Sequence, residues 1–233
     1  MAVMNLRDLG MRRAVKAKPW YPPPMPQLIQ SHIPKTGGKT IRRWLEKEIS
    51  TWEVRGRDDL LNPPPGRHYQ MYLGHLRPDL LVRSGIFTVR QLGQIERFVF
   101  IRNPYARIVS LYNHKRRFGY NESFSEFLHA VERAWSGNSP SERKLRMMSR
   151  PMSYWVFAPN WPGWTHVFQT ESMDDAVRKI QDITGLKSYP PPIDHWPDYP
   201  SGVITALDKK QIDEMYAEDF QKFNYSLSAP DKY

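Results

Sequence analysis

The sequence predicts an α/β domain with a central parallel sheet flanked by helices. A short strand at residues 28–32 runs through a glycine-containing loop into a helix at 39–49. Residues 98–101 form a second strand, apolar on both faces as in the centre of a parallel sheet, and a helix follows it directly. Two strand–loop–helix units in a chain of 233 residues favour one parallel sheet in a single domain.

The first strand–loop–helix unit is predicted from the spacing of apolar residues, and the second from helix-capping residues. In the helix at 39–49, the apolar residues fall on one face: Ile41, Trp44, Leu45 and Ile49. After the strand at 98–101, Asn103 is a good N-cap and Pro104 suits the first helical position. Both helices therefore begin shortly after the carboxyl end of a strand.

The remaining elements are predicted from apolar periodicity and turn residues. Ser172, with Asp175 three residues later, is expected to cap another helix. The other expected elements are strands at 69–73 and 166–169, helices at 124–135 and 208–223, a polar connection at 136–141, a packed aromatic loop at 153–164, and a Trp- and Pro-rich loop at 190–200.

The amino-acid composition limits the classes of protein to which this chain can belong. Hydrophobic residues make up 40% of the chain and charged residues 25%, which is enough for a sizeable core. No stretch approaches the ~18 consecutive apolar residues of a membrane helix, and the basic N-terminus lacks the apolar centre of a secretory signal. The absence of cysteine excludes disulfide scaffolds, thiolate metal sites and cysteine nucleophiles. We expect a soluble, cytoplasmic protein with no membrane span.

Three segments are expected along the chain. Residues 1–26 form a basic, proline-rich arm that ends in an extended run and is predicted to be flexible. Residues 27–228 form the folded domain, and residues 229–233 form a short tail. Oligomeric state leaves no signal in the sequence.

The loop at residues 34–40 has the features of a phosphate site. Its glycines, Gly37 and Gly38, let backbone N–H groups converge on an anion at the start of a helix. Further donors come from Lys35 and Lys39 and from the hydroxyls of Thr36 and Thr40, so all six residues 35–40 are candidate ligands.

A nucleotide kinase is the enzymatic alternative, because residues 38–40 look like the end of a Walker A loop. That pattern needs a glycine five residues before Gly38, where this chain has Ile33. It also needs a magnesium-binding Asp after a buried strand, but the strand at 98–101 is followed by Arg102 and Asn103. Both departures disfavour the kinase.

Arg102 and Ser110 form a second candidate anion site. Arg102 lies at the carboxyl end of a central strand, where open α/β sheets bind ligands. Ser110 follows eight residues later, about two helical turns or roughly 10 Å along the helix, and Arg107 is expected on the same face. Two anion sites at two strand ends suggest a nucleotide phosphorylated at both its 5′ and 3′ positions.

The charge balance agrees with a polyanionic partner but selects none. Lys and Arg number 34 against 24 Asp and Glu, a net charge of +10. A basic nucleic-acid-binding module is therefore the non-enzymatic alternative. It gives no reason for the two motifs at successive strand ends, so we expect no specific binding of nucleic acid.

Residues 32–38 (HIPKTGG) and 98–112 (FVFIRNPYARIVSLY) closely resemble the two donor-binding motifs of the carbohydrate sulfotransferases, nearest the heparan sulfate 2-O-sulfotransferase-like group. Three further segments resemble the same family in order: 72–75 (YLGH), 168–171 (FQTE) and 216–225. The resemblance implies a P-loop-like sulfotransferase fold. It also implies that the first loop binds the 5′-phosphosulfate of 3′-phosphoadenosine 5′-phosphosulfate (PAPS) and that Arg102 and Ser110 bind its 3′-phosphate.

The resemblance also assigns the chemistry. It places His75 as the general base that deprotonates an acceptor hydroxyl, and Lys35 as the cation that stabilises the leaving phosphate of 3′-phosphoadenosine 5′-phosphate (PAP). It implies no metal, and a carbohydrate as the expected acceptor. Lys39 and Asn103 differ from the usual family residues, and residues 194–196 do not match the adenine-side pattern.

Two points stay open at this stage. A PAPS-fold protein that binds glycans without turnover is a third alternative. Four tryptophans could stack on sugar rings, although such clusters more often belong to a minor core: Trp155, Trp161, Trp164 and Trp196. The histidines other than His75 are expected to be structural or on the surface.

Overall fold

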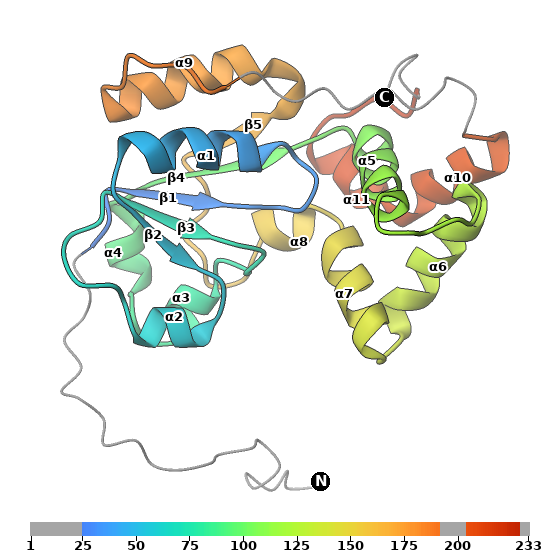
Figure 1. Ribbon diagram of the computed structural model, residues 1–233, viewed down its shortest axis with the longest axis horizontal. Coiled ribbons are helices and arrows are strands. Elements are labelled where there is room, and N and C mark those ends of the chain that lie inside the picture. The colour runs from blue at the N-terminus through green and yellow to red at the C-terminus, as the bar shows by residue number, and fades with distance from the viewer. Residues whose placement is uncertain (1–24, 192–203, 229–233) are drawn as a thin grey trace, which may run out of the picture.

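Five parallel strands form the centre of the protein (Figure 1). The computed structural model describes residues 25–191 and 204–228. The strands lie in the order β2-β3-β1-β4-β5. Their bounds are β1 (Leu28–Ser31), β2 (Thr51–Val54), β3 (Gln70–Leu73), β4 (Glu96–Ile101) and β5 (His166–Gln169). The carboxyl ends of β1, β3 and β4 therefore lie side by side at one edge of the sheet.

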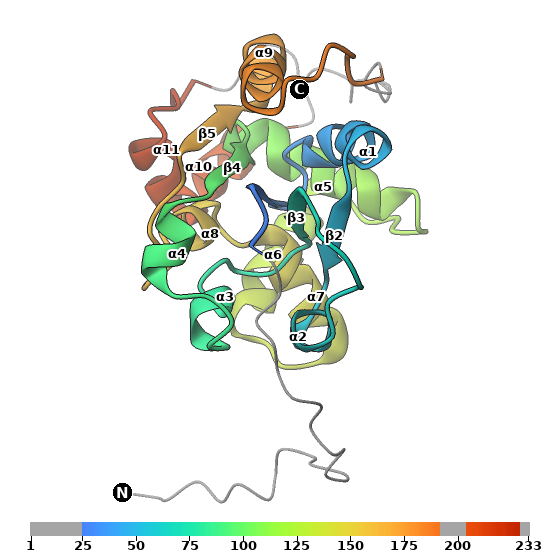
Figure 2. The same cartoon turned by 90° about the vertical axis from the view of Figure 1, so that its left-hand side faces the viewer.

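Helices cover both faces of this sheet (Figure 2). One face carries α1 (Gly38–Glu48) and α9 (Met173–Thr184). The other face carries α2 (Arg57–Leu61), α3 (Leu80–Arg83), α4 (Val89–Gly93) and α8 (Ser153–Val156). A 3₁₀ turn, η2 (Thr170–Ser172), joins β5 to α9. The predicted α/β class is confirmed.

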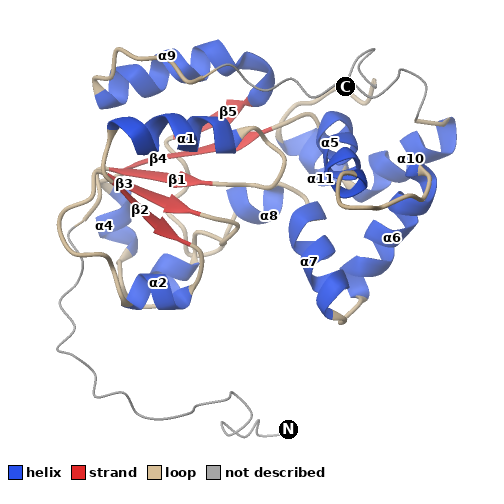
Figure 3. Cartoon of the chain, in the orientation of Figure 1, coloured by secondary structure: helices blue, strands red, loops and turns tan. Residues whose placement is uncertain are grey.

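A second group of helices lies beyond the carboxyl edge of the sheet (Figure 3). It has its own apolar core, which includes Tyr105, Phe127 and Tyr216. Its members are α5 (Pro104–Arg116), α6 (Phe124–Ser136), α7 (Pro140–Ser149), α10 (Ala206–Met215) and α11 (Ala217–Lys222). These helices face the strand ends at which ligands of such sheets bind.

The sequence of β4 explains its central position. Phe98 and Phe100 pack with the residues of α1 and α9, while Val99 and Ile101 pack on the opposite face with Trp155. All four are buried, so the strand is apolar on both faces, as predicted. The side chain of Asn103 accepts from the N–H of Tyr105, and Pro104 opens α5, so the predicted cap is confirmed as well.

Several predicted elements differ from the structure. The strand β2 and the short helices α2, α3 and α4 were not predicted, because four or five residues carry too little periodicity. The polar connection ends early, since Ser139 caps α7 in a capping box with Glu142. The aromatic loop begins with the short helix α8. The helix expected at 208–223 is two helices that meet at Tyr216.

Ser172 does not act as predicted. It precedes α9, but its side chain makes no capping hydrogen bond, and Asp175 instead pairs with Arg178. The loop at 190–200 and the N-terminal arm lie almost wholly outside the described residues, and the tail at 229–233 does so entirely. Within the described ranges, no helix has the length and apolar character needed to cross a bilayer.

Candidate active site

The loop between β1 and α1 is curled by two left-handed residues. Lys35 has φ of 69° and Gly37 has φ of 75°. A Cβ atom on Gly37 would lie 3.1 Å from Cγ2 of Thr170 and 3.3 Å from Cε of Met173, so the position requires glycine on both counts. The curl directs the chain into α1, whose first N–H groups have no partner within the helix. This is the geometry of an anion site at a helix N-terminus.

Threonine hydroxyls fix this loop from beneath. The Thr36 side chain is fully buried, and its hydroxyl donates to the Ile33 carbonyl at 2.9 Å. Oγ1 of Thr170 lies 2.7 Å from the Thr36 carbonyl and 2.8 Å from the Ile101 carbonyl, so it connects the ends of β1 and β4. The Thr36 hydroxyl thus faces the protein interior, unlike the expectation that it supplies a donor to the ligand.

A buried chain of amide side chains anchors the start of α1. Gln30 donates to the Gly38 carbonyl at 3.0 Å, and Gln70 donates to Oε1 of Gln30 at 2.8 Å. The Thr51 hydroxyl donates to Oε1 of Gln70 at 3.1 Å. Because both glutamines are fully buried, losing one partner would leave polar atoms unsatisfied. The sequence analysis missed these residues, although glutamine within a short apolar strand is a usable signal.

Two cations at this edge, Lys35 and Arg102, make no direct ion pair among the described residues, although the carboxylate of Glu171 acts on Arg102 through its charge. The guanidinium of Arg102 makes no hydrogen bond or ion pair with any residue that the structure describes. Partial burial, followed by the charge of Arg102, lowers the pKa of Lys35 to about 8. Lys39 is exposed and adds a smaller repulsion. Mutual repulsion between such cations is relieved when an anion binds between them.

Ser110 and Thr40 are both half-buried. Ser110 lies on α5, where its hydroxyl has no partner among the described residues. The backbone N–H of Thr40 donates to the Gly37 carbonyl at 3.1 Å, so this amide is used within the loop. The charges of Lys35 and Arg102 therefore act on each other. No hydrogen bond among the described residues joins Ser110 to either side chain.

Arg107 is buried and does not share an anion-binding face with Ser110. Its Nε donates to the Pro34 carbonyl at 3.0 Å. Its two terminal nitrogens donate to the Arg150 carbonyl at 2.9 Å and the Met148 carbonyl at 3.1 Å. Burial lowers the pKa of Arg107 from its ordinary value. The residue ties the phosphate loop to the segment after α7, a role that helical spacing alone could not show.

His75 lies just beyond the end of β3 and is exposed. Its Nδ1 lies 3.1 Å from the carbonyl oxygen of His32. Because a carbonyl can only accept, Nδ1 carries the hydrogen and Nε2 is left as the basic nitrogen. The protein atoms around the ring displace water and lower the pKa of His75, against the hydrogen bond to His32, and the charge of Arg107 lowers it further. The ring is therefore a neutral proton acceptor near neutral pH.

His32 supports this arrangement from the strand end. Its Nδ1 is hydrogen-bonded to the Tyr72 hydroxyl, and its ring centroid lies 4.9 Å from that of His75. Burial, followed by the charge of His75, lowers the pKa of His32 to about 3, so the imidazole is neutral. The guanidinium of Arg42 lies 4.7 Å from the centroid of the Tyr72 ring. The predicted structural role of His32 agrees with these contacts.

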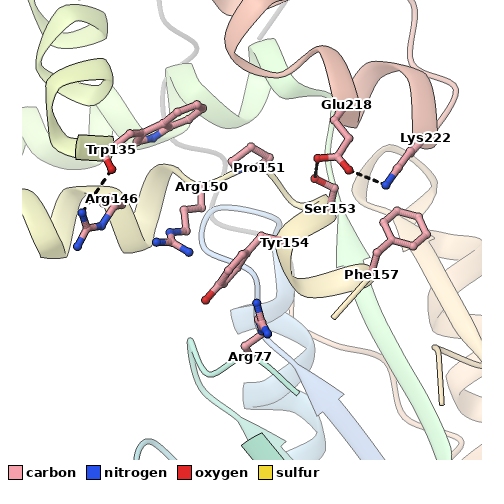
Figure 4. A pocket seen from close by; sticks show the side chains of 10 residues that line it. All are labelled: Arg77, Trp135, Arg146, Arg150, Pro151, Ser153, Tyr154, Phe157, Glu218 and Lys222. Carbon is pink, nitrogen blue, oxygen red and sulfur yellow. Dashed lines mark hydrogen bonds and ion pairs between the residues drawn. The ribbon is translucent and has the colours of Figure 1, made fainter. Parts of the chain in front are cut away.

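A cavity of about 450 Å³ opens beside this edge (Figure 4). Arg77, two residues after His75, lines it, as does Arg150, whose carbonyl is held by Arg107. Its lining residues are Arg77, Trp135, Arg146, Arg150, Pro151, Ser153, Tyr154, Phe157, Glu218 and Lys222. None of the four tryptophans considered for sugar stacking is among them.

Those four tryptophans have other positions. Trp155 and Trp161 are buried in the core, and Trp164 packs against both of their clusters. Trp196 lies outside the described residues, as does the whole segment 194–196. Among the described residues, no three His, Asp or Glu side chains are placed to hold a metal ion together.

Comparison with known proteins supports the family and the fold. The sequence profile of the sulfotransferase family matches residues 24–226. The fold is similar to a sulfotransferase from Alicyclobacillus acidocaldarius, with a TM-score of 0.53, 14% identity, and 86% of this chain and 94% of that chain covered. Mouse sulfotransferase SULT7A1 complexed with PAP matches with a TM-score of 0.45 and 12% identity over 88% of this chain and 68% of that chain.

No curated protein sequence is significantly similar to this chain. The family profile nevertheless covers the sheet, the phosphate loop, Arg102 and His75 in one continuous match. The heparan sulfate 2-O-like subgroup receives no separate support, so the assignment stays at the level of the family. The chain belongs to the sulfotransferase family.

Proposed function

We propose that the protein transfers the sulfuryl group of PAPS to an acceptor hydroxyl, expected on a carbohydrate. One observation carries this proposal: Lys35 and Arg102 follow the neighbouring strands β1 and β4, and among the described residues neither side chain makes an ion pair or a hydrogen bond. Two anion sites at adjacent strand ends fit a ligand phosphorylated at both ends of its ribose. Family membership supports sulfuryl transfer as the reaction.

The donor would occupy the sheet edge. The first N–H groups of α1 and the side chains of Lys35 and Lys39 bind its 5′-phosphosulfate, with Thr40 at the end of the same loop. Thr36 contributes through its backbone, because its hydroxyl is engaged with Ile33. Arg102 and Ser110 bind the 3′-phosphate.

Each catalytic residue then has a defined task. Nε2 of His75 accepts the proton of the acceptor hydroxyl as its oxygen forms a bond to sulfur. On the far side of the sulfur, the bond to the bridging phosphate oxygen breaks and its electrons stay on that oxygen. Lys35 stabilises the negative charge that PAP gains. His75 afterwards returns its proton to solvent, so the cycle needs no other reactant.

The first experiment titrates the protein with PAP in the absence of magnesium, and with ATP plus magnesium in parallel, by calorimetry. We expect PAP to bind at least tenfold more tightly than ATP, and a mixed oligonucleotide to bind weakly. Tight binding of ATP that depends on magnesium, with no preference for PAP, would contradict the proposal and favour the kinase. A preference for the oligonucleotide would favour the nucleic-acid module.

Turnover separates an enzyme from an inactive binder. PAPS is incubated with the protein and a panel of hydroxyl acceptors, and the release of PAP is followed. We expect PAP release that depends on both acceptor and protein. Tight PAP binding without any turnover across the panel would instead support the alternative of a glycan-binding protein.

A further inference from the structure

The cavity beside His75 has walls of unequal charge and shape. Four of its lining side chains are cations and three are aromatic, while Glu218 is the one carboxylate among those drawn in Figure 4. A volume of about 450 Å³ is within the range of pockets for small molecules, roughly 300–1,000 Å³. The number of cations alone would suggest a polyanionic ligand, so their individual partners decide the matter.

Two of the cations are directly engaged with carboxylates. Arg77 holds the buried carboxylate of Asp79 in a two-pronged contact, with nitrogen–oxygen distances of 2.7 and 2.8 Å. Lys222 pairs with Glu218 one turn earlier on α11, and its Nζ lies 4.4 Å from the centroid of the Phe157 ring. Arg83 also pairs with Asp79 at 2.9 Å, so Arg77 shares its carboxylate, whereas Lys222 and Glu218 balance each other.

A third cation is used within the protein. Arg146 donates to the Gly137 carbonyl at 2.8 Å and to the Trp135 carbonyl at 3.3 Å. These carbonyls lie at the carboxyl end of α6, where a positive charge is favourable. The guanidinium of Arg146 therefore satisfies backbone carbonyls at the carboxyl end of α6.

Arg150 remains. Its guanidinium makes no ion pair and no hydrogen bond with any described residue, and it lies 4.3 Å from the centroid of the Tyr154 ring (Figure 4). The guanidinium of Arg77 lies 4.8 Å from the centroid of the same ring. Among the described residues that line the pocket, Arg150 is thus the cation whose side chain makes neither a hydrogen bond nor an ion pair.

The pocket wall is fixed relative to the donor loop. One guanidinium, that of Arg107, binds the Arg150 carbonyl and the Pro34 carbonyl together. On the opposite side, Arg77 follows His75 by two residues, so the proposed base and the pocket share one short segment. A ligand in this pocket would therefore contact one residue on the segment of the base and another on a segment tied to the donor loop.

We propose that this pocket holds the acceptor, and that the acceptor is a small monoanion. Its single carboxylate pairs with Arg150, beside the Tyr154 ring over which this guanidinium lies. The proposal rests on the sulfotransferase function and narrows its substrate class. A long polyanionic chain does not fit a pocket with one free cation, because the other three cations are already engaged.

The test compares two matched probes, p-nitrophenyl β-D-glucuronide and p-nitrophenyl β-D-glucoside, which differ in one carboxylate. Each is titrated by calorimetry into the protein saturated with PAP. A charge-assisted contact predicts that the glucuronide binds about 10- to 150-fold more tightly than the glucoside. In Arg150→Gln we expect this preference to disappear while glucoside affinity stays within about threefold. Equal binding of the two probes to the parent protein, or no binding of either, would overturn the proposal.

Lys144→Gln is the matched control, since Lys144 is an exposed cation of α7 outside the pocket. It should keep the preference that Arg150→Gln loses. PAP affinity, measured in both variants, shows that each one folds. If the preference persists in Arg150→Gln, Arg150 is not the anion site and the proposal is wrong.

A further probe distinguishes a monoanion from a polyanion. An octasaccharide of alternating glucuronate and N-acetylglucosamine should bind no more tightly than the single glucuronide. Binding more than tenfold tighter, weakening steeply with salt, would overturn the monoanion assignment.

The same titrations without PAP keep this proposal separable from the donor assignment. A preference for the glucuronide in protein that fails to bind PAP would sustain the pocket and refute the sulfotransferase mechanism. PAP binding with no preference between the two sugars would do the reverse.

Discussion

The sheet edge and the helical wall that faces it are built differently. The edge comes from strand–loop–helix units: Arg102 directly follows β4, and Lys35 lies in the short loop between β1 and α1. The wall collects residues from α6, α7, α8 and α11, which are separated by more than eighty positions between Trp135 and Lys222. The proposed donor site can therefore be predicted from short segments, whereas the proposed acceptor pocket exists only after the chain has folded.

The largest expected effect is a loss of turnover without a loss of PAP affinity. His75→Ala removes the base that the His32 carbonyl orients, and we expect kcat to fall by about 10²- to 10⁴-fold. PAP affinity should stay unchanged, because the donor cations are untouched. Single-turnover kinetics with PAPS measure the first quantity and calorimetry the second. His129→Ala, at an exposed position of α6, is the control. Near-parental turnover in His75→Ala would place the base elsewhere.

The second effect acts on the sheet edge alone. Arg102→Ala should weaken the binding of PAP by about 10- to 150-fold, the factor expected for loss of a charge-assisted contact. Adenosine 5′-phosphosulfate lacks the 3′-phosphate and should lose little affinity. Binding of the glucuronide to the wall should not change. Equal losses for the two nucleotides, measured by titration, would remove Arg102 from the 3′-phosphate site.

The smallest expected effect is on the pH dependence of kcat/KM. His75 acts as a base only when neutral, and its pKa lies below the usual ~6.5, so kcat/KM should decline only at acidic pH. Lys35 binds anions only when charged, and its pKa is about 8, so kcat/KM should also decline above that pH. Each limb approaches tenfold per pH unit.

Lys35→Arg sharpens this prediction. A guanidinium stays protonated throughout the accessible range, so the alkaline limb should vanish while the acidic limb remains. A pH profile of kcat/KM in both proteins checks this result. An alkaline limb that persists in Lys35→Arg belongs to another group.

The residues explain how far the sequence could be read. The apolar run of β4 and the cap at Asn103 depend on neighbours in the chain, and both were predicted. The engagement of Arg107 with three carbonyls depends on segments about 40 and 70 residues away, and no local pattern contains it. Gln30 and Gln70 likewise meet only when β1 and β3 pair.

The short length of some elements also limited what could be predicted from the sequence. β2 spans four residues, so its alternation of half-buried and buried positions became clear only beside β3. α10 ends at Met215, and at the break the Tyr216 hydroxyl donates to the Ser149 carbonyl at 2.7 Å, a contact with a distant segment. The apolar stripe continues through this break, which is why one helix was expected.

Arg107 limits how such a protein can be rebuilt. Its three acceptor carbonyls belong to the phosphate loop and to the wall, so the two regions share one buried side chain. A chimaera that takes the wall from one protein and the nucleotide half from another must keep this arginine and all three carbonyls in register. Exchanging acceptor preference by grafting the wall alone would therefore sacrifice the donor loop, and single substitutions inside the pocket are the safer route.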